Sequence, residues 1–411
     1  MKHERHLGMS ASRLDRISEL LKTTYIEPNK IAGCQALVAR RGEIAYGQSF
    51  GRMDLARDKP WRDDTVVRIY SMTKPVVSLA LMMLWERGLF QLDEPVARVL
   101  PEWAEQRIWL SGEGETMVTA APKKPVTFRQ LLSHTAGLTY GGLLEQFGAP
   151  PSVHPVEKAY KALRVRRDPA EDLDAFVGKL GQVPLLYQPD EQWMYSLATD
   201  VVGALVQRIS GKPLDRFLRD EIFEPLRMVD TGFSVAPANV DRFAACYSWT
   251  ASKALALSDD PQTSAYLNAP VFLSGGGGLV STLGDYHRFC EMLRRGGELD
   301  GVRLIGPRTL SLMTGNHLKN KACLAELALD GFSETTPAGI GFGLGFAMTT
   351  DAIRAGSPSK DDYYWGGAAS TLFWVDPSED LVVIFLTQLM PSTTFNFRGQ
   401  LKNIIYAAIE D

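Results

Sequence analysis

The strongest helical pattern in this chain is a run of apolar residues that starts just after position 70. From Ser71 to about Arg87 the segment is apolar on almost every side, and Gly88 supplies a stop signal. A helix without a polar face is buried between other elements, so we expect a central helix here. The same periodicity predicts helices at residues 10–28, 127–133, 198–209, 214–223 and 285–294.

Strand patterns are found towards the two ends of the chain. Residues 34–39 and 43–47 predict a hairpin that turns at Arg41 and Gly42. Further strands are expected only much later, at residues 341–348, 369–375 and 381–387. The pattern therefore predicts one sheet that both ends of the chain build, interrupted by a helical insertion.

This distribution predicts two domains in an α/β (α+β) fold. We expect residues 1–90 and 255–411 to form the sheet domain and residues 91–254 to form a largely helical domain. The 411 residues are 45% hydrophobic, which is enough apolar surface for a full globular core.

Charge and composition narrow the classes of partner. The net charge is −4, the sequence pI is about 6.0 and no polybasic run is present, so nucleic acid is not an expected partner. The longest apolar run, residues 76–85, is too short to cross a bilayer, so no membrane association is expected either. Residues 1–6 do not resemble an export signal, and we expect a cytoplasmic protein.

The metal-binding residue types are scattered. The 6 histidines do not cluster, and the 4 cysteines are too widely spaced for a metal pattern or a disulfide framework. We expect four buried, reduced thiols and neither a metal nor another cofactor. Oligomeric state is left open, and a homo-oligomer is one possibility.

Ser71 and Lys74 are the best candidates for chemistry. Residues three apart share a helix face, so the amine of Lys74 can lie against the hydroxyl of Ser71. A serine needs a base to become a nucleophile, and the positive end of the helix dipole favours an alkoxide there. The alternative is a structural N-cap serine followed by a solvated lysine.

Two further serine motifs are weaker candidates. Ser357 and Lys360 repeat the spacing, but Pro358 and the surrounding polar residues indicate a surface turn. Ser49 lies in a Gly-x-Ser-x-Gly pentapeptide, which in hydrolases needs a sharp turn from strand into helix. No helical pattern follows it here, so we interpret Ser49 as part of a strand.

Three other segments contain side chains or backbone groups suited to catalysis. Tyr195 lies in a loop before a predicted helix, and its hydroxyl could relay a proton. Gly366 and Gly367 precede a strand, where they would let the backbone N–H of Ala368 approach a developing oxyanion. His134 follows a predicted helix and is expected to be structural, bonded to local backbone.

Taken together, these segments resemble the serine β-lactamase-like and penicillin-binding superfamily. They are most similar to class C β-lactamases and the related family VIII carboxylesterases. The matching segments follow the family's order over roughly residues 10 to 405, at residues 71–74, 132–138, 195–196, 222–226, 230–233, 276–282, 341–346 and 365–367.

The resemblance implies a mainly antiparallel sheet flanked by helices, plus a largely helical domain. It also implies that Ser71 is acylated, that Lys74 is the base and that Tyr195 shares its proton and protonates the leaving group. The backbone N–H groups of Ser71 and Ala368 would form the oxyanion hole.

Two departures from the β-lactamase pattern point to the esterase branch. Class C β-lactamases carry Tyr-x-Asn, whereas this chain has Leu197 in place of the asparagine. They also carry Lys-Thr-Gly where this chain has Trp365, Gly366 and Gly367. Trp365 is uncharged and apolar, so we expect a pocket for uncharged acyl groups. Further pocket-lining candidates are Tyr140, Phe342, Gly366 and Gly367.

We therefore expect a serine esterase that acts on small or medium carboxylic esters through an acyl-enzyme. An acyltransferase would use the same residues, and a weak β-lactamase or amidase is a second alternative. A non-catalytic binding module on the same fold is the alternative from a different class. Ser71, Lys74 and Tyr195 are all present, which argues against it.

Overall fold

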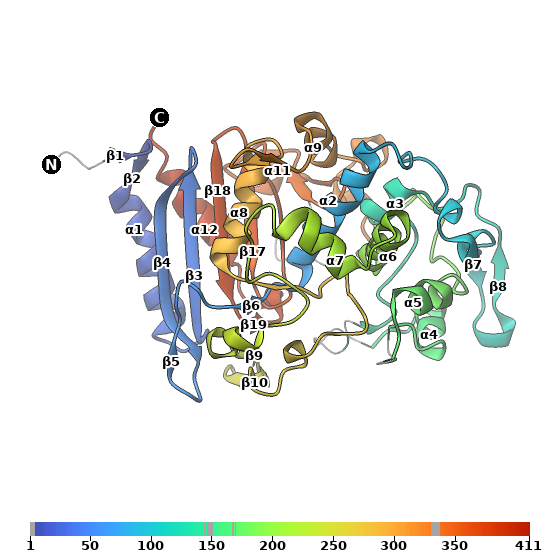
Figure 1. Ribbon diagram of the computed structural model, residues 1–411, viewed down its shortest axis with the longest axis horizontal. Helices are drawn as coiled ribbons and strands as arrows, with labels where there is room; N and C mark the ends of the chain where they lie inside the picture. The colour runs from blue at the N-terminus through green and yellow to red at the C-terminus, as the bar shows by residue number, and fades with distance from the viewer. Residues whose placement is uncertain (1–4, 144, 146–150, 167, 169, 330–337) are drawn as a thin grey trace.

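The computed structural model describes residues 5–143, 145, 151–166, 168, 170–329 and 338–411, so residues 1–4 of the segment examined for an export signal lie outside it. Its main sheet has eight strands in the order β14-β15-β16-β17-β18-β3-β4-β5 (Figure 1). In that order they span Ile340–Phe342, Ala347–Thr349, Tyr363–Gly366, Leu372–Asp376, Leu381–Thr387, Gly33–Arg40, Glu43–Asp54 and Lys59–Pro60. All neighbours are antiparallel.

The two ends of the chain meet in the middle of this sheet. β18 pairs with β3 along its whole length, with Val383 opposite Val38. Every residue of β3 and of β18 is buried. A strand that is covered on both faces is apolar throughout rather than alternating, which is how residues 381–387 read in the sequence. The prediction of a sheet built from both chain ends is confirmed.

Helices cover both faces of the sheet. Phe373 of β17 contacts Tyr286 of α8 (Leu283–Arg294), with ring centroids 5.2 Å apart. Phe385 of β18 points to the opposite face and contacts Phe397 of α12 (Phe397–Ala407) at 4.9 Å. α12 also packs against α1 (Ala11–Glu19). α8 accordingly lies in front of the sheet and α12 behind it in Figure 1.

The middle of the chain is largely helical, as predicted. Its helices are α3 (Phe128–Leu132), α4 (Pro155–Ala162), α5 (Leu173–Leu180), α6 (Ala198–Ser210) and α7 (Leu214–Leu218). The sequence did not predict the β-hairpin that β7 (Ile108–Ser111) and β8 (Val118–Ala120) form at the far right of Figure 1. These strands are short and partly exposed, so they lack a strong apolar alternation. The domain boundaries near residues 90 and 255 stay a prediction.

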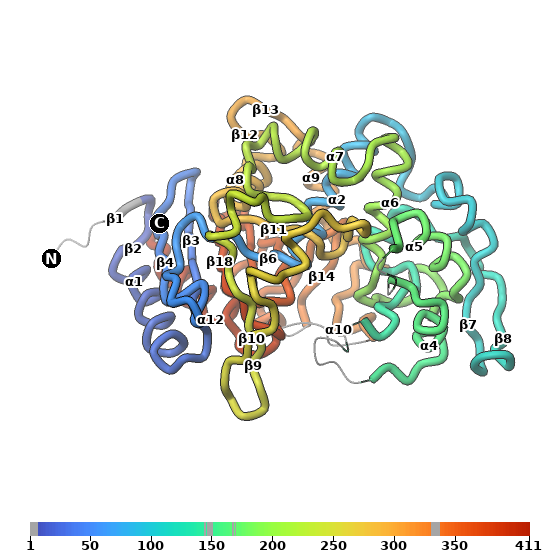
Figure 2. The backbone as a smooth tube through the Cα atoms, turned by 60° about the horizontal axis from the view of Figure 1, so that its bottom comes forward, coloured from blue at the N-terminus to red at the C-terminus, as the bar shows by residue number. Residues whose placement is uncertain are grey.

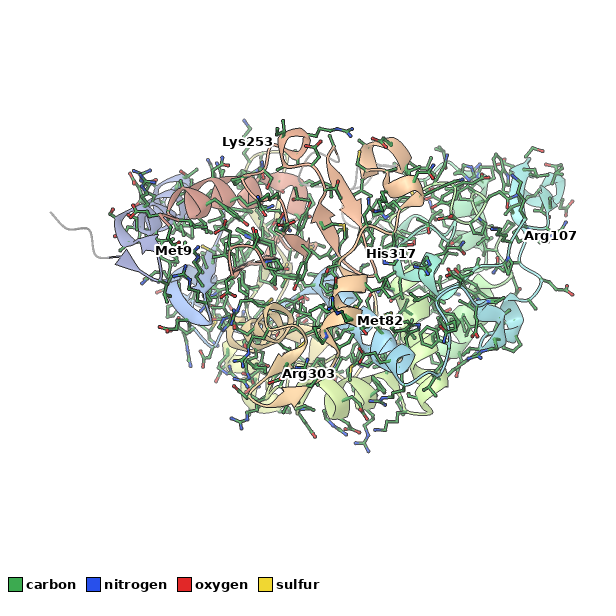
Figure 3. All side chains as sticks on the ribbon, turned by 90° about the horizontal axis from the view of Figure 1, so that it is seen from above. Met9, Met82, Arg107, Lys253, Arg303 and His317 are labelled. Atoms are coloured by element: carbon green, nitrogen blue, oxygen red, sulfur yellow. The ribbon has the colours of Figure 1, made fainter. Side chains whose placement is uncertain are left out.

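The predicted central helix is α2 (Thr73–Glu86), and it joins the two regions. Its residues from Thr73 to Leu84 are all buried, and it packs against α6. Seen from above, Met82 of α2 lies in the middle of the molecule, whereas Met9 and Arg107 lie at opposite ends (Figure 3). No helix among the described residues is long and apolar enough to cross a membrane.

Smaller sheets complete the fold. β6 (Val67–Arg68) pairs with β11 (Val280–Ser281) near the middle of the molecule in Figure 2. β9 (Cys246–Trp249) lies between β10 (Leu255–Asp259) and β19 (Leu389–Met390). The remaining short elements are β1 (Arg5–His6), β2 (Met9–Ser10), β12 (Glu298–Leu299), β13 (Val302–Arg303), α9 (Pro307–Met313), α10 (Leu324–Leu327) and α11 (Ala352–Ala355).

Two predicted strands differ from the structure. Residues 341–348 form a hairpin of β14 and β15 rather than one strand, because Gly345 has a φ of +96° and reverses the chain. The strand predicted at residues 369–375 begins only at Leu372, because residues 367–370 form a turn in which Ser370 has a φ of +62°. The four cysteines are buried and unpaired, as expected.

Candidate active site

Ser71 lies in a single 3-10 turn, Tyr70–Met72, directly before α2. The sequence placed it on the α-helix itself, so the helix begins two residues later than predicted. Tyr70 has a φ of +41°, a strained value for a residue with a side chain. Such strain is retained where the surrounding structure enforces it, often at functional sites. The turn holds Ser71 partly exposed at the positive end of a 14-residue helix.

A buried arginine anchors the strand that leads to Ser71. Arg68 is fully buried, and its guanidinium donates to Asp259 at 2.6 Å and to the carbonyl of Ala244 at 2.7 Å. Gln388 accepts from the backbone N–H of Arg68 at 3.1 Å and donates to its carbonyl at 3.1 Å. Because both the side chain and the backbone of this residue are held, the start of the turn has a fixed position.

Lys74 contacts three acceptors at once. Its Nζ lies 3.2 Å from Oγ of Ser71, 3.0 Å from the hydroxyl of Tyr140 and 2.6 Å from the carbonyl oxygen of Gly276. It also lies 4.5 Å from the ring centroid of Tyr195. Lys74 is only 2% exposed, so these contacts are made away from bulk water. The structure therefore brings together the predicted serine–lysine pair.

Two tyrosines flank the lysine. The rings of Tyr140 and Tyr195 are 5.2 Å apart, and the hydroxyl of Tyr195 accepts from Nε1 of Trp365 at 3.2 Å. Burial raises the pKa of Tyr140 well above its ordinary value, and the nearby Tyr195 and Asp200 act in the same direction. Tyr140 is therefore a neutral phenol at physiological pH, able to accept from Lys74 but not to serve as a phenolate base.

His134 connects the loops that carry the two tyrosines. Its Nδ1 lies 3.1 Å from Oγ of Ser196, and its carbonyl accepts from the N–H of Met194 at 3.0 Å. The predicted structural role is consistent with these contacts, although the side-chain partner is 62 residues away rather than local backbone. Burial, and then the charge of Lys74, lower the pKa of His134 well below its ordinary value. The imidazole is therefore neutral.

The segment around Gly367 packs against the residues that lead into the Ser71 turn. A Cβ at Gly367 would lie 2.4 Å from the carbonyl oxygen of Ile69, so only glycine fits between the two segments. This packing brings the adjacent Ala368 close to the chain leading to Ser71. Among the described residues the backbone N–H of Ala368 has no acceptor, as an oxyanion-hole donor requires.

The remaining pocket candidates form an aromatic cluster beside the tyrosines. Trp365 is partly exposed, and its ring lies 5.2 Å from that of Tyr195 and 5.3 Å from that of Phe342. Phe342 is only 1% exposed, and its ring packs edge-on against that of Trp365. We therefore expect it to support the pocket wall from the protein interior. Gly366 is the last residue of β16 and is partly exposed. Leu197, which replaces the asparagine of β-lactamases, is fully buried.

The two weaker serine motifs lie in other settings. Ser49 lies within β4, and its hydroxyl donates to Asp63 at 2.8 Å. Ser357 and Lys360 follow α11 in a non-helical segment, as predicted. The only described lysine contact of these two serines is a longer one, from Nζ of Lys402 in α12 to Oγ of Ser357 at 3.4 Å, and Lys402 is already paired with the carboxylate of Asp362.

Sequence reasoning missed one partner of Lys74 and the carboxylate that contacts this partner. The carbonyl of Gly276 was not foreseen, because a backbone group leaves no mark in residue types. Asp200, which bonds the N–H of Gly276 at 2.9 Å, was also missed. In the sequence, Asp200 is an acidic residue in the first turn of a largely apolar helix. Acidic residues are common there because they interact favourably with the helix dipole, so this one gave no reason to expect a functional role.

Comparison with known proteins identifies the family of this chain. The family model described as Beta-lactamase matches residues 21–405. Esterase EstB of Burkholderia gladioli is 33% identical over 393 residues, covering 92% of this chain and 90% of its own length. Monacolin J acid methylbutanoyltransferase of Aspergillus terreus is 27% identical over 399 residues, covering 90% of this chain and 91% of its own.

A solved structure supports the same assignment. EstCE1, a hydrolase with promiscuous acyltransferase activity, superposes with a TM-score of 0.76 at 27% identity and covers 98% of each chain. The superposition therefore spans nearly the whole of both chains. With a family model that spans nearly the whole sequence, this protein belongs to the Beta-lactamase family.

Proposed function

We propose that this protein is a serine carboxylesterase that forms an acyl-enzyme on Ser71. The observation that carries the proposal is the 3.2 Å contact between Oγ of Ser71 and Nζ of the buried Lys74. A neutral Lys74 takes the proton of Ser71 as Oγ attacks the ester carbonyl carbon. The resulting oxyanion accepts hydrogen bonds from the backbone N–H groups of Ser71 and Ala368.

Collapse of this intermediate breaks the ester C–O bond. Tyr195 gives a proton to the departing alkoxide, and Lys74 replaces that proton through the hydroxyl network. Water then attacks the acyl-Ser71 ester, the same groups return the proton to Oγ, and the carboxylic acid leaves. The aromatic groups at Trp365 and Tyr140 support a preference for uncharged acyl groups of small or medium size.

The matched serines in the chain provide the test. Ser71→Ala is expected to abolish hydrolysis of a p-nitrophenyl ester, with a loss of several orders of magnitude in kcat, because the members of such a unit fail together. Ser49→Ala, the control, is expected to keep full activity, because the described partner of the Ser49 hydroxyl is the carboxylate of Asp63, in the turn after β5, and not Lys74. Intact-mass spectrometry should find one acyl group, on the peptide that contains Ser71. Loss of activity in a folded Ser49→Ala variant would refute the assignment.

Acyl transfer is the second candidate, and the relatives favour it. EstCE1 and the methylbutanoyltransferase both carry transfer activity in their descriptions. Transfer differs from hydrolysis only in the acceptor that attacks the acyl-enzyme. Product analysis with added alcohols separates the two, since a transferase yields the new ester in preference to the acid. A chromogenic cephalosporin tests the β-lactamase alternative, for which Leu197 offers no amide donor.

The setting of the enzyme is also part of the proposal. The four buried, unpaired cysteines support a reducing compartment, and we propose a cytoplasmic location.

A further inference from the structure

The glycine-rich loop at residues 274–278 connects a buried carboxylate to Lys74. Asp200, in the first turn of α6, has no exposed surface. Its Oδ1 accepts from Oγ of Ser274 at 2.7 Å and from the backbone N–H of Gly276 at 2.9 Å. The carbonyl oxygen of that same Gly276 accepts from Nζ of Lys74 at 2.6 Å. One residue therefore contacts the carboxylate through its N–H and the lysine through its C=O.

The loop packs so closely against α6 that no side chain fits between them. A Cβ at Gly275 would lie 2.5 Å from the carbonyl oxygen of Thr199, and a Cβ at Gly276 would lie 2.8 Å from Oδ2 of Asp200. On its other side the loop is held to the nucleophile helix, because the N–H of Leu279 donates to Oγ1 of Thr73 at 3.2 Å. The glycines are required here by close approach rather than by an unusual φ.

The geometry around Lys74 gives the carbonyl a chemical role. A neutral amine has two N–H groups and one lone pair, whereas Lys74 has three partners. If the N–H groups point to Gly276 and Tyr140, the lone pair must face Oγ of Ser71. An amine in this orientation is ready to take the serine proton, so the position of the Gly276 carbonyl decides where the lone pair points.

We propose that Asp200 is a positioning residue for the general base: it fixes the carbonyl that orients Lys74, and it supplies a buried negative charge behind that carbonyl. This inference rests on the proposed esterase function. The charge is poorly compensated, because Oδ2 has no hydrogen-bond partner among the described residues and Nη1 of Arg166 is 3.7 Å away. In a low-dielectric site such a charge favours the ammonium form of the lysine.

Other charged and titratable groups surround Asp200 and Lys74 and affect the pH dependence of this site. Arg166 faces Asp200 from the segment after α4, and it also donates to Oγ of Ser274 at 3.0 Å. Tyr140 responds to the charges of both Asp200 and Arg166, and neutral His134 responds to the charge of Lys74. Among these groups Asp200 is the source of negative charge. Removing that charge should therefore move the acidic limb of the pH profile in one predictable direction.

The test compares pH profiles of kcat/KM for Asp200→Asn and the wild type with a p-nitrophenyl ester. Asparagine keeps an oxygen for Ser274 and Gly276 but removes the charge, so the ammonium of Lys74 loses stabilisation. The acidic limb of the profile, which reports ionisation in the free enzyme, is expected to move to lower pH by about 0.5 unit or more. Asp200→Ala also frees the loop and is expected to lower kcat about 100-fold.

Asp285→Asn is the matched control. Asp285 is also buried in the first turn of a helix, α8, but its carboxylate accepts from Asp230 and Thr231. Its loss should lower the melting temperature and leave the acidic limb in place. A residue that only stabilises the fold would behave in the same way at position 200.

Arg166→Met provides a second variant with the opposite sign. Arg166 is 28% exposed, so its replacement is tolerated more easily, and loss of its positive charge should move the acidic limb to higher pH. The inference would be overturned if Asp200→Asn left the acidic limb of the kcat/KM profile at the wild-type pH. If Asp200→Asn does not fold, an acidic limb that stays in place in Arg166→Met would overturn it instead. Retained activity in Ser71→Ala would instead refute the esterase mechanism itself, so the two failures are distinguishable.

Discussion

Removing the hydroxyl of either tyrosine beside Lys74 is expected to lower the activity, but in a different way for each tyrosine. Tyr140 accepts from Nζ of Lys74 at 3.0 Å, whereas Tyr195 accepts from Nε1 of Trp365 at 3.2 Å and presents its ring to the lysine. Tyr140→Phe therefore removes a group that orients the base. Tyr195→Phe removes the group that we propose protonates the leaving alkoxide.

The magnitudes follow from these contacts. A hydrogen bond from a neutral donor contributes about 0.5–1.5 kcal/mol, so Tyr140→Phe should lower kcat/KM by about 2- to 13-fold for every ester. General acid catalysis contributes about 10²- to 10⁴-fold, and Tyr195→Phe should lose that much on simple alkyl esters. A p-nitrophenolate leaves without protonation, so the same variant should lose only about tenfold on p-nitrophenyl esters.

The assay is a comparison of both variants on p-nitrophenyl and ethyl esters of one acid, with product formation followed by titration of released acid. Melting temperatures within a few degrees of the wild type would show that the fold is kept. The reasoning fails if Tyr140→Phe, rather than Tyr195→Phe, shows the dependence on the leaving group, because Tyr140 would then be the proton donor. Near-normal turnover of Tyr195→Phe on ethyl esters would remove Tyr195 from the proton path.

Two further changes test the surroundings of the site. Gly367→Ala places a Cβ 2.4 Å from the carbonyl oxygen of Ile69, so we expect an overpacking cost of about 1–3 kcal/mol and a clear fall in kcat. Gly178→Ala, in α5 with no atom within 4 Å of the new Cβ, should keep both stability and turnover, and equal effects at the two sites would contradict this account. Burial lowers the pKa of His134 in the folded protein. Below the pKa of about 6.5 that this histidine has in the unfolded chain, only the unfolded chain binds the extra proton, so the protein becomes less stable as the pH falls. The loss should total about 1.4 kcal/mol in denaturant titrations between pH 7.5 and 5.5, and His134→Asn should show a shallower fall. An identical fall in the variant would assign the acid sensitivity to other groups.

Local pattern was enough to predict the elements that bury themselves completely. α2 and β18 have few polar residues, so their type and length followed from the sequence, and β18 spans the predicted residues 381–387. The hairpin at β14 and β15 was read as one strand because both arms are apolar and the turn depends on the φ of Gly345 alone. A turn of this kind depends on the conformation of one residue, so the periodic pattern of apolar and polar residues does not reveal it.

The site was predictable only to the extent that its residues are close in sequence. Ser71 and Lys74 are one helical turn apart, so their contact follows from helix geometry. Tyr140 lies 66 residues from Lys74, and nothing local distinguishes it from a core tyrosine. Its position results from the loop after α3, which bonds the Tyr195 loop through His134. Such placement depends on tertiary packing, which residue spacing does not encode.

The pairing of β3 with β18 has a consequence for when the enzyme becomes active. These strands are separated by about 340 residues along the chain, and Ala368, the proposed oxyanion donor, precedes β18 only narrowly. During synthesis the serine and lysine leave the ribosome early, but the strand that closes the sheet and the amide that would stabilise the tetrahedral intermediate emerge near the end. A nascent chain would thus carry its proposed nucleophile in an inactive setting, and reactivity towards esters would arise only once the far segments have docked.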